Sequence, residues 1–118
     1  MKADKRLAKI LAAECHRRMG NDIQLLDVRK TCDYCNHVLM VSGKNRMHLD
    51  ALTSHLRDVI TEKGASCYGI DGKPDSGWII MDLGAIVIHL FLPEIRDFYD
   101  LPGLWSNARK VDLELPRE

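Results

Sequence analysis

Two nearly continuous apolar stretches constrain the fold of this chain more than any other feature of its sequence. They cover residues 78–82 and 86–92, and Leu83-Gly84-Ala85 separates them. A short connection with glycine at the bend predicts a β-hairpin. Strands that are apolar at almost every position must be covered on both faces, so they lie centrally in a sheet. The hairpin therefore predicts a layered structure in which other elements cover the sheet.

The rest of the chain supplies those elements. Apolar residues recur at helical spacing over residues 1–20 and 45–64, with Asn45 expected as N-cap and Gly20 and Gly64 expected to end the two helices. The expected order is α-β-β-α-β-β-β-α, which predicts an α/β single-domain mixed β-sheet flanked by helices. The further segments are strands over 23–28, 38–41 and 67–70 and a short helix from Pro93 to Leu101.

Length and composition bound the domain organisation. A chain of 118 residues has the size of one domain, and 46% hydrophobic with 29% charged residues is an ordinary globular mixture. No apolar run reaches the roughly 18 residues needed to span a bilayer, which predicts a soluble protein. We assign residues 1–107 to the α/β domain, with an amphipathic helix at 1–20, and residues 108–118 to a polar C-terminal tail.

Charge is balanced overall but not along the chain. Seventeen basic residues face seventeen acidic ones, which excludes a polyanion-binding protein held by bulk charge alone. Residues 1–30 hold eight basic and four acidic residues, whereas residues 71–118 hold nine acidic and five basic residues. The acidic C-terminal half is therefore suited to docking on a basic partner.

Motifs for enzyme chemistry are sparse. Ser42–Gly43 before a helix is similar to the start of a phosphate-binding turn, but a glycine-rich loop and a Gly-Lys-Ser/Thr sequence are missing. Asp82 stands alone at a strand end, although metal-dependent nucleotidyl transfer needs closely spaced carboxylates. His89 lies within an apolar strand, as core or interface histidines do. We predict no catalytic residues, and a nucleotide-binding or nucleotidyltransferase enzyme using Ser42–Gly43 and Asp82 stays as the alternative.

The cysteines offer a second alternative. Cys32 and Cys35 have the spacing of a metal or redox pair, and His37 follows two residues later. Structural zinc takes four ligands, yet Cys15 and Cys67 stand alone, and the motif precedes a strand instead of opening a helix. We predict reduced thiols and no metal, with a small Cys32/Cys35 zinc module as the alternative.

Aromatic residues concentrate late in the chain. Each one alone fits a hydrophobic core, but together with the flanking charges they favour a protein-binding surface. Five of the seven follow residue 77, namely Trp78, Phe91, Phe98, Tyr99 and Trp105.

A longer signature covers the same half of the chain. The runs Trp78-x-x-x-Asp82-x-Gly84-x-Ile86-Val-Ile-His89 and Pro93-Glu94-x-Arg96-x-Phe98-Tyr99-x-Leu101-x-x-Leu104-Trp105 closely resemble the ribosomal silencing factor family, RsfS, also called Iojap. Asp22-Ile-x-x-Leu-Asp27-Val, Val41-Ser-Gly43 and Asn45-Arg46 fit the same pattern. The resemblance extends over residues 5–107 and implies a nucleotidyltransferase-like fold without the catalytic carboxylates.

The resemblance also implies a function. Members of this family bind the large ribosomal subunit through its ribosomal protein number fourteen and keep the small subunit from joining. Bacterial members silence translation during starvation, and mitochondrial members assist late large-subunit assembly beside an LYR-motif protein and acyl carrier protein. A member would have no cofactor, no membrane contact and little or no sequence-specific nucleic-acid contact.

Candidate contact residues follow from the signature, and two positions depart from it. Ala85 replaces the usual Asp after the hairpin glycine, and Asn36-His37-Val38 replaces an Asp-Tyr-Phe run. Ala85 and Leu92-Pro93-Glu94 resemble mitochondrial members, so we expect the mitochondrial matrix, with the bacterial cytoplasm as alternative. The candidate partner-binding residues are Arg46, Trp78, Asp82, His89, Glu94, Arg96, Tyr99, Leu101 and Trp105.

Overall fold

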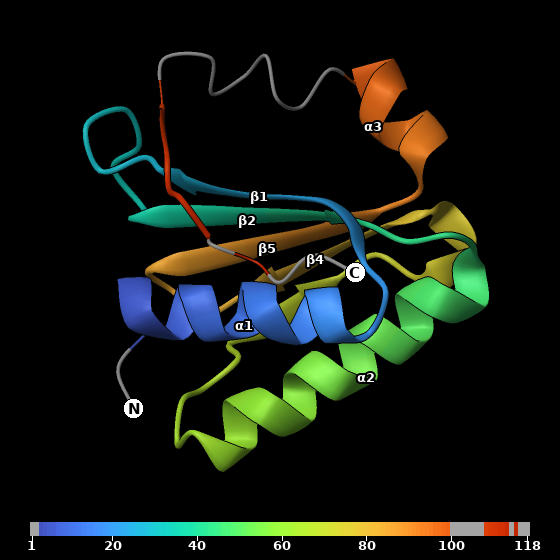
Figure 1. Cartoon of the computed structure of the whole chain (residues 1–118), viewed down its shortest axis with the longest axis horizontal. Coiled ribbons are helices and arrows are strands. Elements are labelled where there is room, and N and C mark those ends of the chain that lie inside the picture. The colour runs from blue at the N-terminus through green and yellow to red at the C-terminus, as the bar shows by residue number, and fades with distance from the viewer. Residues whose placement is uncertain (1–2, 100–107, 114, 116–118) are drawn as a thin grey trace.

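The computed structural model describes residues 3–99, 108–113 and 115 and confirms the predicted mixed α/β class (Figure 1). The helices are α1 (Lys5–Arg17), α2 (Arg46–Glu62) and α3 (Pro93–Tyr99). The strands are β1 (Asn21–Asp27), β2 (His37–Ser42), β3 (Gly69–Asp71), β4 (Trp78–Asp82), β5 (Ile86–Phe91) and β6 (Arg109–Lys110), and a 3-10 turn spans Pro74–Ser76. Over these residues, neither α1, α2 nor α3 has the length and apolar composition of a membrane-crossing helix.

The described strands form one six-stranded sheet in the order β3-β4-β5-β2-β1-β6. The predicted hairpin is confirmed, because β4 and β5 pair antiparallel with Trp78 opposite Phe91 and Ile80 opposite His89. β5 and β2 pair parallel at the centre, and every residue of β2 is buried. The continuous apolar character of β5 thus reflects its central place in the sheet.

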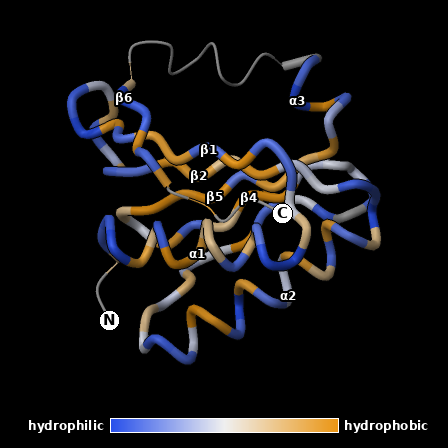
Figure 2. The backbone as a smooth tube through the Cα atoms, in the orientation of Figure 1, coloured by the Kyte–Doolittle hydropathy of each residue, from blue (hydrophilic) through white to orange (hydrophobic). Residues whose placement is uncertain are grey.

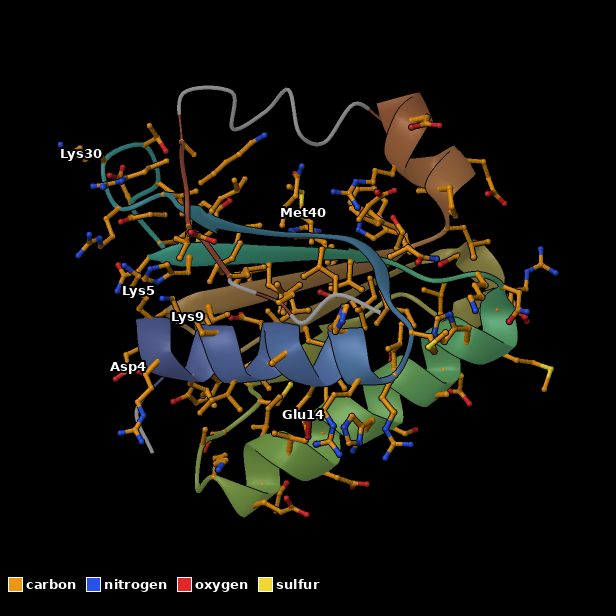
Figure 3. The ribbon with its side chains drawn as sticks, viewed as in Figure 1. Asp4, Lys5, Lys9, Glu14, Lys30 and Met40 are labelled. Atoms are coloured by element: carbon orange, nitrogen blue, oxygen red, sulfur yellow. The ribbon has the colours of Figure 1, made fainter. Side chains whose placement is uncertain are left out.

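Helices lie on both sides of the sheet. α1 and α2 lie on one face, where apolar residues such as Leu11, Leu52 and Leu56 pack against the strands (Figures 1 and 2). α3 lies on the opposite side, and Met40 points toward that side (Figure 3). We call this second surface the α3 face; its buried apolar residues are Leu26, Val28, Cys35, Val38, Met40 and Phe91.

The helix ends confirm two predictions and correct one. Asn45 caps α2, since its Oδ1 accepts a hydrogen bond from the His48 backbone N–H at 2.8 Å. Gly64 follows α2 with φ +71°, the left-handed conformation that glycine adopts easily. After α1, however, Met19 adopts the left-handed conformation with φ +68°. Gly20 follows Met19, donates its N–H to the Cys15 backbone oxygen at 2.8 Å, and has no room for a side chain because a Cβ there would lie 2.8 Å from Cγ1 of Val41.

The C-terminal segment adds a strand that the sequence did not predict. Residues 108–118 were expected to form a polar tail, yet β6 pairs antiparallel with β1, placing Arg109 opposite Asp27 and Lys110 opposite Leu26. Val111 and Leu113 pack against the core to which α1, α2 and the sheet contribute. A two-residue strand of exposed basic residues has no apolar alternation that could reveal it.

Candidate functional site

Several predicted contact residues come from one end of the sheet. Ser42 and Phe91, the last residues of parallel strands β2 and β5, are register partners. The chain continues from β2 into α2 and from β5 into α3, while Trp78 begins β4 opposite Phe91. The starts of α2 and α3 therefore lie at the same end of the molecule as Trp78 (Figure 1).

A row of side chains on the α3 face connects these elements. The Trp78 indole Nε1–H donates to His89 Nδ1 at 3.2 Å, and the two ring centroids are 6.0 Å apart. The Phe91 ring stacks 6.4 Å from the His89 ring, and the guanidinium carbon of Arg96 lies 5.2 Å from the Phe91 centroid. We call Trp78, His89, Phe91 and Arg96 the aromatic row. Its contacts fix the start of β4 and the first turn of α3 to the centre of the sheet.

His89 is the uncharged centre of the aromatic row. Its side chain is buried, and this burial lowers the pKa of His89 from 6.5 to about 4. The neutral ring accepts the indole proton on Nδ1 and therefore carries its own proton on Nε2. His89 thus positions Trp78 from within the protein.

Arg96 anchors α3 from inside the protein. Its Nη1 donates to the backbone oxygen of Asp22 at 2.7 Å and to Ser42 Oγ at 2.9 Å. Only 7% of the residue is exposed, and burial lowers the pKa of the guanidinium group, which nevertheless stays protonated because arginine does not deprotonate in proteins. The structure therefore assigns Arg96 a positioning role among the predicted contact residues.

Other residues at this end remain open to a partner. Trp78 is partly exposed, and Arg46 and Glu94 are exposed at the starts of α2 and α3. Sequence reasoning missed Met47, which is 83% exposed; its position outside the apolar stripe of α2 was the available signal. We call Arg46, Met47, Trp78, Glu94 and the exposed Asp97 the docking end.

Asp82 lies away from the docking end. In the register, Asp82 pairs with Val87, and Val87 pairs with Val38 near the start of β2, at the other end of the sheet from Ser42. Asp82 Oδ1 accepts the Gly84 backbone N–H at 2.8 Å and so stabilises the hairpin turn. The structure does not bring Asp82 together with Trp78.

The positions that depart from the family signature gather at this opposite end. The backbone oxygen of Ala85 accepts hydrogen bonds from the backbone N–H groups of Asn36 and His37, at 2.8 and 3.0 Å. The β1–β2 connection therefore contacts the hairpin turn at Ala85, one of the positions that depart from the expected signature.

The residues of the enzyme alternative do not form a site. Ser42 is fully buried and accepts a hydrogen bond from Arg96, and a Cβ at Gly43 would lie 2.7 Å from the Leu49 side chain. Asp82 belongs to the other end of the sheet. Within the described residues, no group of three or more His, Cys, Asp and Glu side chains could hold a metal ion, which applies equally to the zinc alternative.

The last three predicted contacts are Tyr99, Leu101 and Trp105. Tyr99 ends α3. The side chain of Tyr99, together with Leu101 and Trp105, lies outside the described residues.

Comparison with known proteins agrees with this architecture. The family model for "Ribosomal silencing factor during starvation" matches residues 1–118. The chain is 29% identical to RsfS of Bacillus subtilis over 110 residues, 93% of each chain. It is 34% identical to RsfS of Zymomonas mobilis over 106 residues, 90% of this chain and 80% of that one.

Two further relatives extend the comparison. The mouse "Mitochondrial assembly of ribosomal large subunit protein 1" is 32% identical over 111 residues, covering 90% of this chain and 47% of the mouse protein. A crystallised protein of Chromobacterium violaceum is 26% identical with a TM-score of 0.81, covering 96% of this chain and 94% of that one. By sequence over its whole length and by fold, the chain belongs to the ribosomal silencing factor (RsfS) family.

Proposed function

We propose that this protein binds the large ribosomal subunit and sterically blocks premature joining of the small subunit. It would thereby assist late large-subunit assembly or silence translation. Membership of the RsfS family and the mouse relative named for large-subunit assembly support this function. The observation that carries the proposal is the docking end, where exposed charged and apolar groups lie at the same end of the sheet as Trp78, which the aromatic row holds in place.

The docking end has the chemistry of a protein-binding surface. Met47 and Trp78 supply apolar and aromatic area, which is enriched at protein interfaces. Glu94 and Asp97 place two exposed carboxylates on α3. Exposed carboxylates complement a basic surface, and ribosomal proteins are generally basic. The proposed partner is ribosomal protein number fourteen of the large subunit.

The proposal makes the chain a binding protein and not an enzyme. Its relatives are named as silencing factors, and the serine and glycine of the enzyme alternative are used in packing. A protein that blocks subunit joining only has to occupy the surface between the two ribosomal subunits, so this function requires no cofactor.

We place the protein in the mitochondrial matrix, bound to ribosomes. The resemblance of Ala85 and the Leu92–Glu94 run to mitochondrial members supports this location, and the mouse relative is 32% identical. An LYR-motif protein and acyl carrier protein would accompany it there. The 34% identity to a bacterial relative keeps the bacterial cytoplasm as the alternative.

Charge reversal on α3 tests the docking end. The double variant Glu94→Lys, Asp97→Lys should weaken binding to purified large subunits by about tenfold or more, because two rim charges would then repel a basic partner. Asp58→Lys, an exposed carboxylate on α2, is the matched control and should bind like the natural protein. Equal affinity of all three proteins in a pelleting assay would contradict the proposed docking end.

A further inference from the structure

Cys32 and Cys35 form a close pair that the proposed function does not use. Both belong to the connection between β1 and β2, and their Sγ atoms are 3.3 Å apart. Thiols at this separation need only a small side-chain rotation to reach the bonding distance of about 2.05 Å. The described residues supply no third ligand that would turn the pair into a metal site.

The backbone holds the two thiols together. The Cys32 and Thr31 N–H groups both donate to the Val28 backbone oxygen, at 2.8 and 3.0 Å. The Asn36 N–H donates to Ala85 at 2.8 Å, just after Cys35. The segment carrying both cysteines is therefore fixed at each end, which lowers the entropy cost of joining the sulfur atoms.

The two thiols differ in access and in acidity. Cys32 is partly exposed, whereas Cys35 is only 4% exposed. Burial opposes ionisation of Cys32, but the hydrogen bonds it accepts from Tyr34 and Cys35 outweigh this effect and lower its pKa. Burial, followed by the neighbouring Cys32, raises the pKa of the Cys35 thiol to about 12. Cys32 therefore ionises first and meets a reagent first.

Basic residues lie close in sequence to the accessible thiol. Lys30 extends from the same connection (Figure 3), and it lines a hollow beside Thr31 with Arg29 and Arg109. Asp27 neutralises Arg29 through an ion pair of 2.7 Å, so Lys30 and Arg109 supply the net positive charge of this hollow. Such a surface attracts small anions, including peptides with free carboxylates.

We propose that Cys32 and Cys35 form a reversible dithiol–disulfide site that reacts with anionic low-molecular-weight disulfides of the glutathione type. The Cys32 thiolate attacks one sulfur of the reagent, forms a mixed disulfide and expels the first small thiolate. Cys35 then loses its proton and attacks Cys32 Sγ, closing the intramolecular disulfide and expelling the second small thiolate. The protein dithiol is oxidised, the reagent is reduced to two thiols, and these take up the two protein protons.

Mass spectrometry of the full chain tests the proposal. The reduced protein is treated with glutathione disulfide, alkylated, and digested. The expected product has a disulfide between Cys32 and Cys35, while Cys15 and Cys67 stay reduced and are recovered in alkylated form. In Cys35→Ser the reaction should stop at one glutathione on Cys32, and in Cys32→Ser glutathione addition should slow by about tenfold or more.

Two controls keep the test decisive. Cys67→Ser removes the other partly exposed thiol and should leave formation of the 32–35 disulfide unchanged. Cystamine, a cationic disulfide, should react more slowly with Cys32 than glutathione disulfide does, and circular dichroism verifies that each variant is folded. Reaction at Cys67 as fast as at Cys32, or a mixed disulfide that persists on Cys32 of the natural chain, would overturn the proposal.

Discussion

His89 makes the folded chain sensitive to acid, because its pKa is lowered from 6.5 to about 4 by burial. Between pH 4 and pH 6.5 the His89 imidazole is therefore protonated in the unfolded chain and neutral in the folded chain. Above pH 6.5 the titration of His89 does not reduce the free energy of unfolding. As the pH falls from 6.5 toward 4, protonation of His89 in the unfolded chain lowers this free energy. The loss amounts to about 3 kcal/mol of unfolding free energy at pH 4.

Urea unfolding at a series of pH values measures this loss. His37 acts in the same direction, since burial also lowers its pKa. The variant His89→Gln keeps an acceptor for the Trp78 indole but cannot titrate, so its stability should fall less steeply with pH. Identical pH dependence in the two proteins would show that His89 does not carry the effect.

Trp78 has a structural role and a proposed binding role, and two substitutions separate them. Trp78→Phe removes the N–H that bonds His89 and should cost about 1 kcal/mol of stability with little loss of ribosome binding. Trp78→Ala also removes the exposed ring area and should weaken ribosome binding by roughly 2 kcal/mol or more. Unchanged ribosome affinity of Trp78→Ala, with a lowered melting temperature, would make Trp78 a packing residue only.

Arg96 should contribute to stability through its buried contacts. Arg96→Met removes the bonds to Asp22 and Ser42 and should cost about 2–3 kcal/mol in urea unfolding, because the Ser42 hydroxyl loses its donor in the interior. Arg57→Met, an exposed arginine on α2, should change stability by less than about 0.5 kcal/mol. Equal stability of the two variants would remove the positioning role of Arg96.

The sequence singled out Arg96 but could not reveal its role. Its two acceptors lie 74 and 54 residues earlier in the chain, and no local pattern encodes a contact over that distance. Arginine beside aromatic residues is common both on interfaces and over buried rings. The fold alone decides between these environments, and here it places Arg96 in the interior.

Gly72, in the connection between β3 and β4, has no room for a side chain. Gly72 has φ +85°, and a Cβ there would lie 2.1 Å from the Trp78 backbone oxygen. Gly72→Ala should therefore destabilise the fold by about 2 kcal/mol or more, since neither the conformation nor the space suits alanine. Gly69 in β3 is the matched control, because a Cβ there meets nothing within 4 Å.

Thermal unfolding measures both glycine variants. Gly69→Ala should be neutral or stabilising by about 0.4–1 kcal/mol, because alanine restricts the unfolded chain. A Gly72→Ala variant as stable as Gly69→Ala would mean that the β3–β4 turn differs from the one described.

At the scale of elements, local signals predicted most of the fold. The stripe of α2 and its Asn45 cap lie within a few turns of chain, and the hairpin is marked by Gly84 between apolar strands. β6 was missed because its pairing with β1 joins residues more than eighty positions apart. Gly20 was expected to end α1 because glycine is the usual left-handed residue after a helix, but Met19 takes that conformation and the packing of Gly20 against Val41 was not visible in the sequence.

At the scale of the whole molecule, the docking end and the Cys32–Cys35 pair lie at opposite ends of the sheet. The docking end lies where β2 and β5 finish, and the Cys32–Cys35 pair precedes the start of β2 at the other end of the sheet. Formation of the disulfide between Cys32 and Cys35 therefore does not block the docking end. The acidic excess of residues 71–118 falls on the half of the chain that contains α3, which suits a basic partner.

Sedimentation of the tagged protein through a sucrose gradient of native lysate tests whether the protein acts on the large ribosomal subunit. The protein should co-migrate with free large subunits and be absent from joined ribosomes. The double charge reversal at Glu94 and Asp97 should shift the protein to the top of the gradient, while Asp58→Lys should not. Migration of the natural protein only at the top, in growing and starved cells alike, would contradict a function on the ribosome.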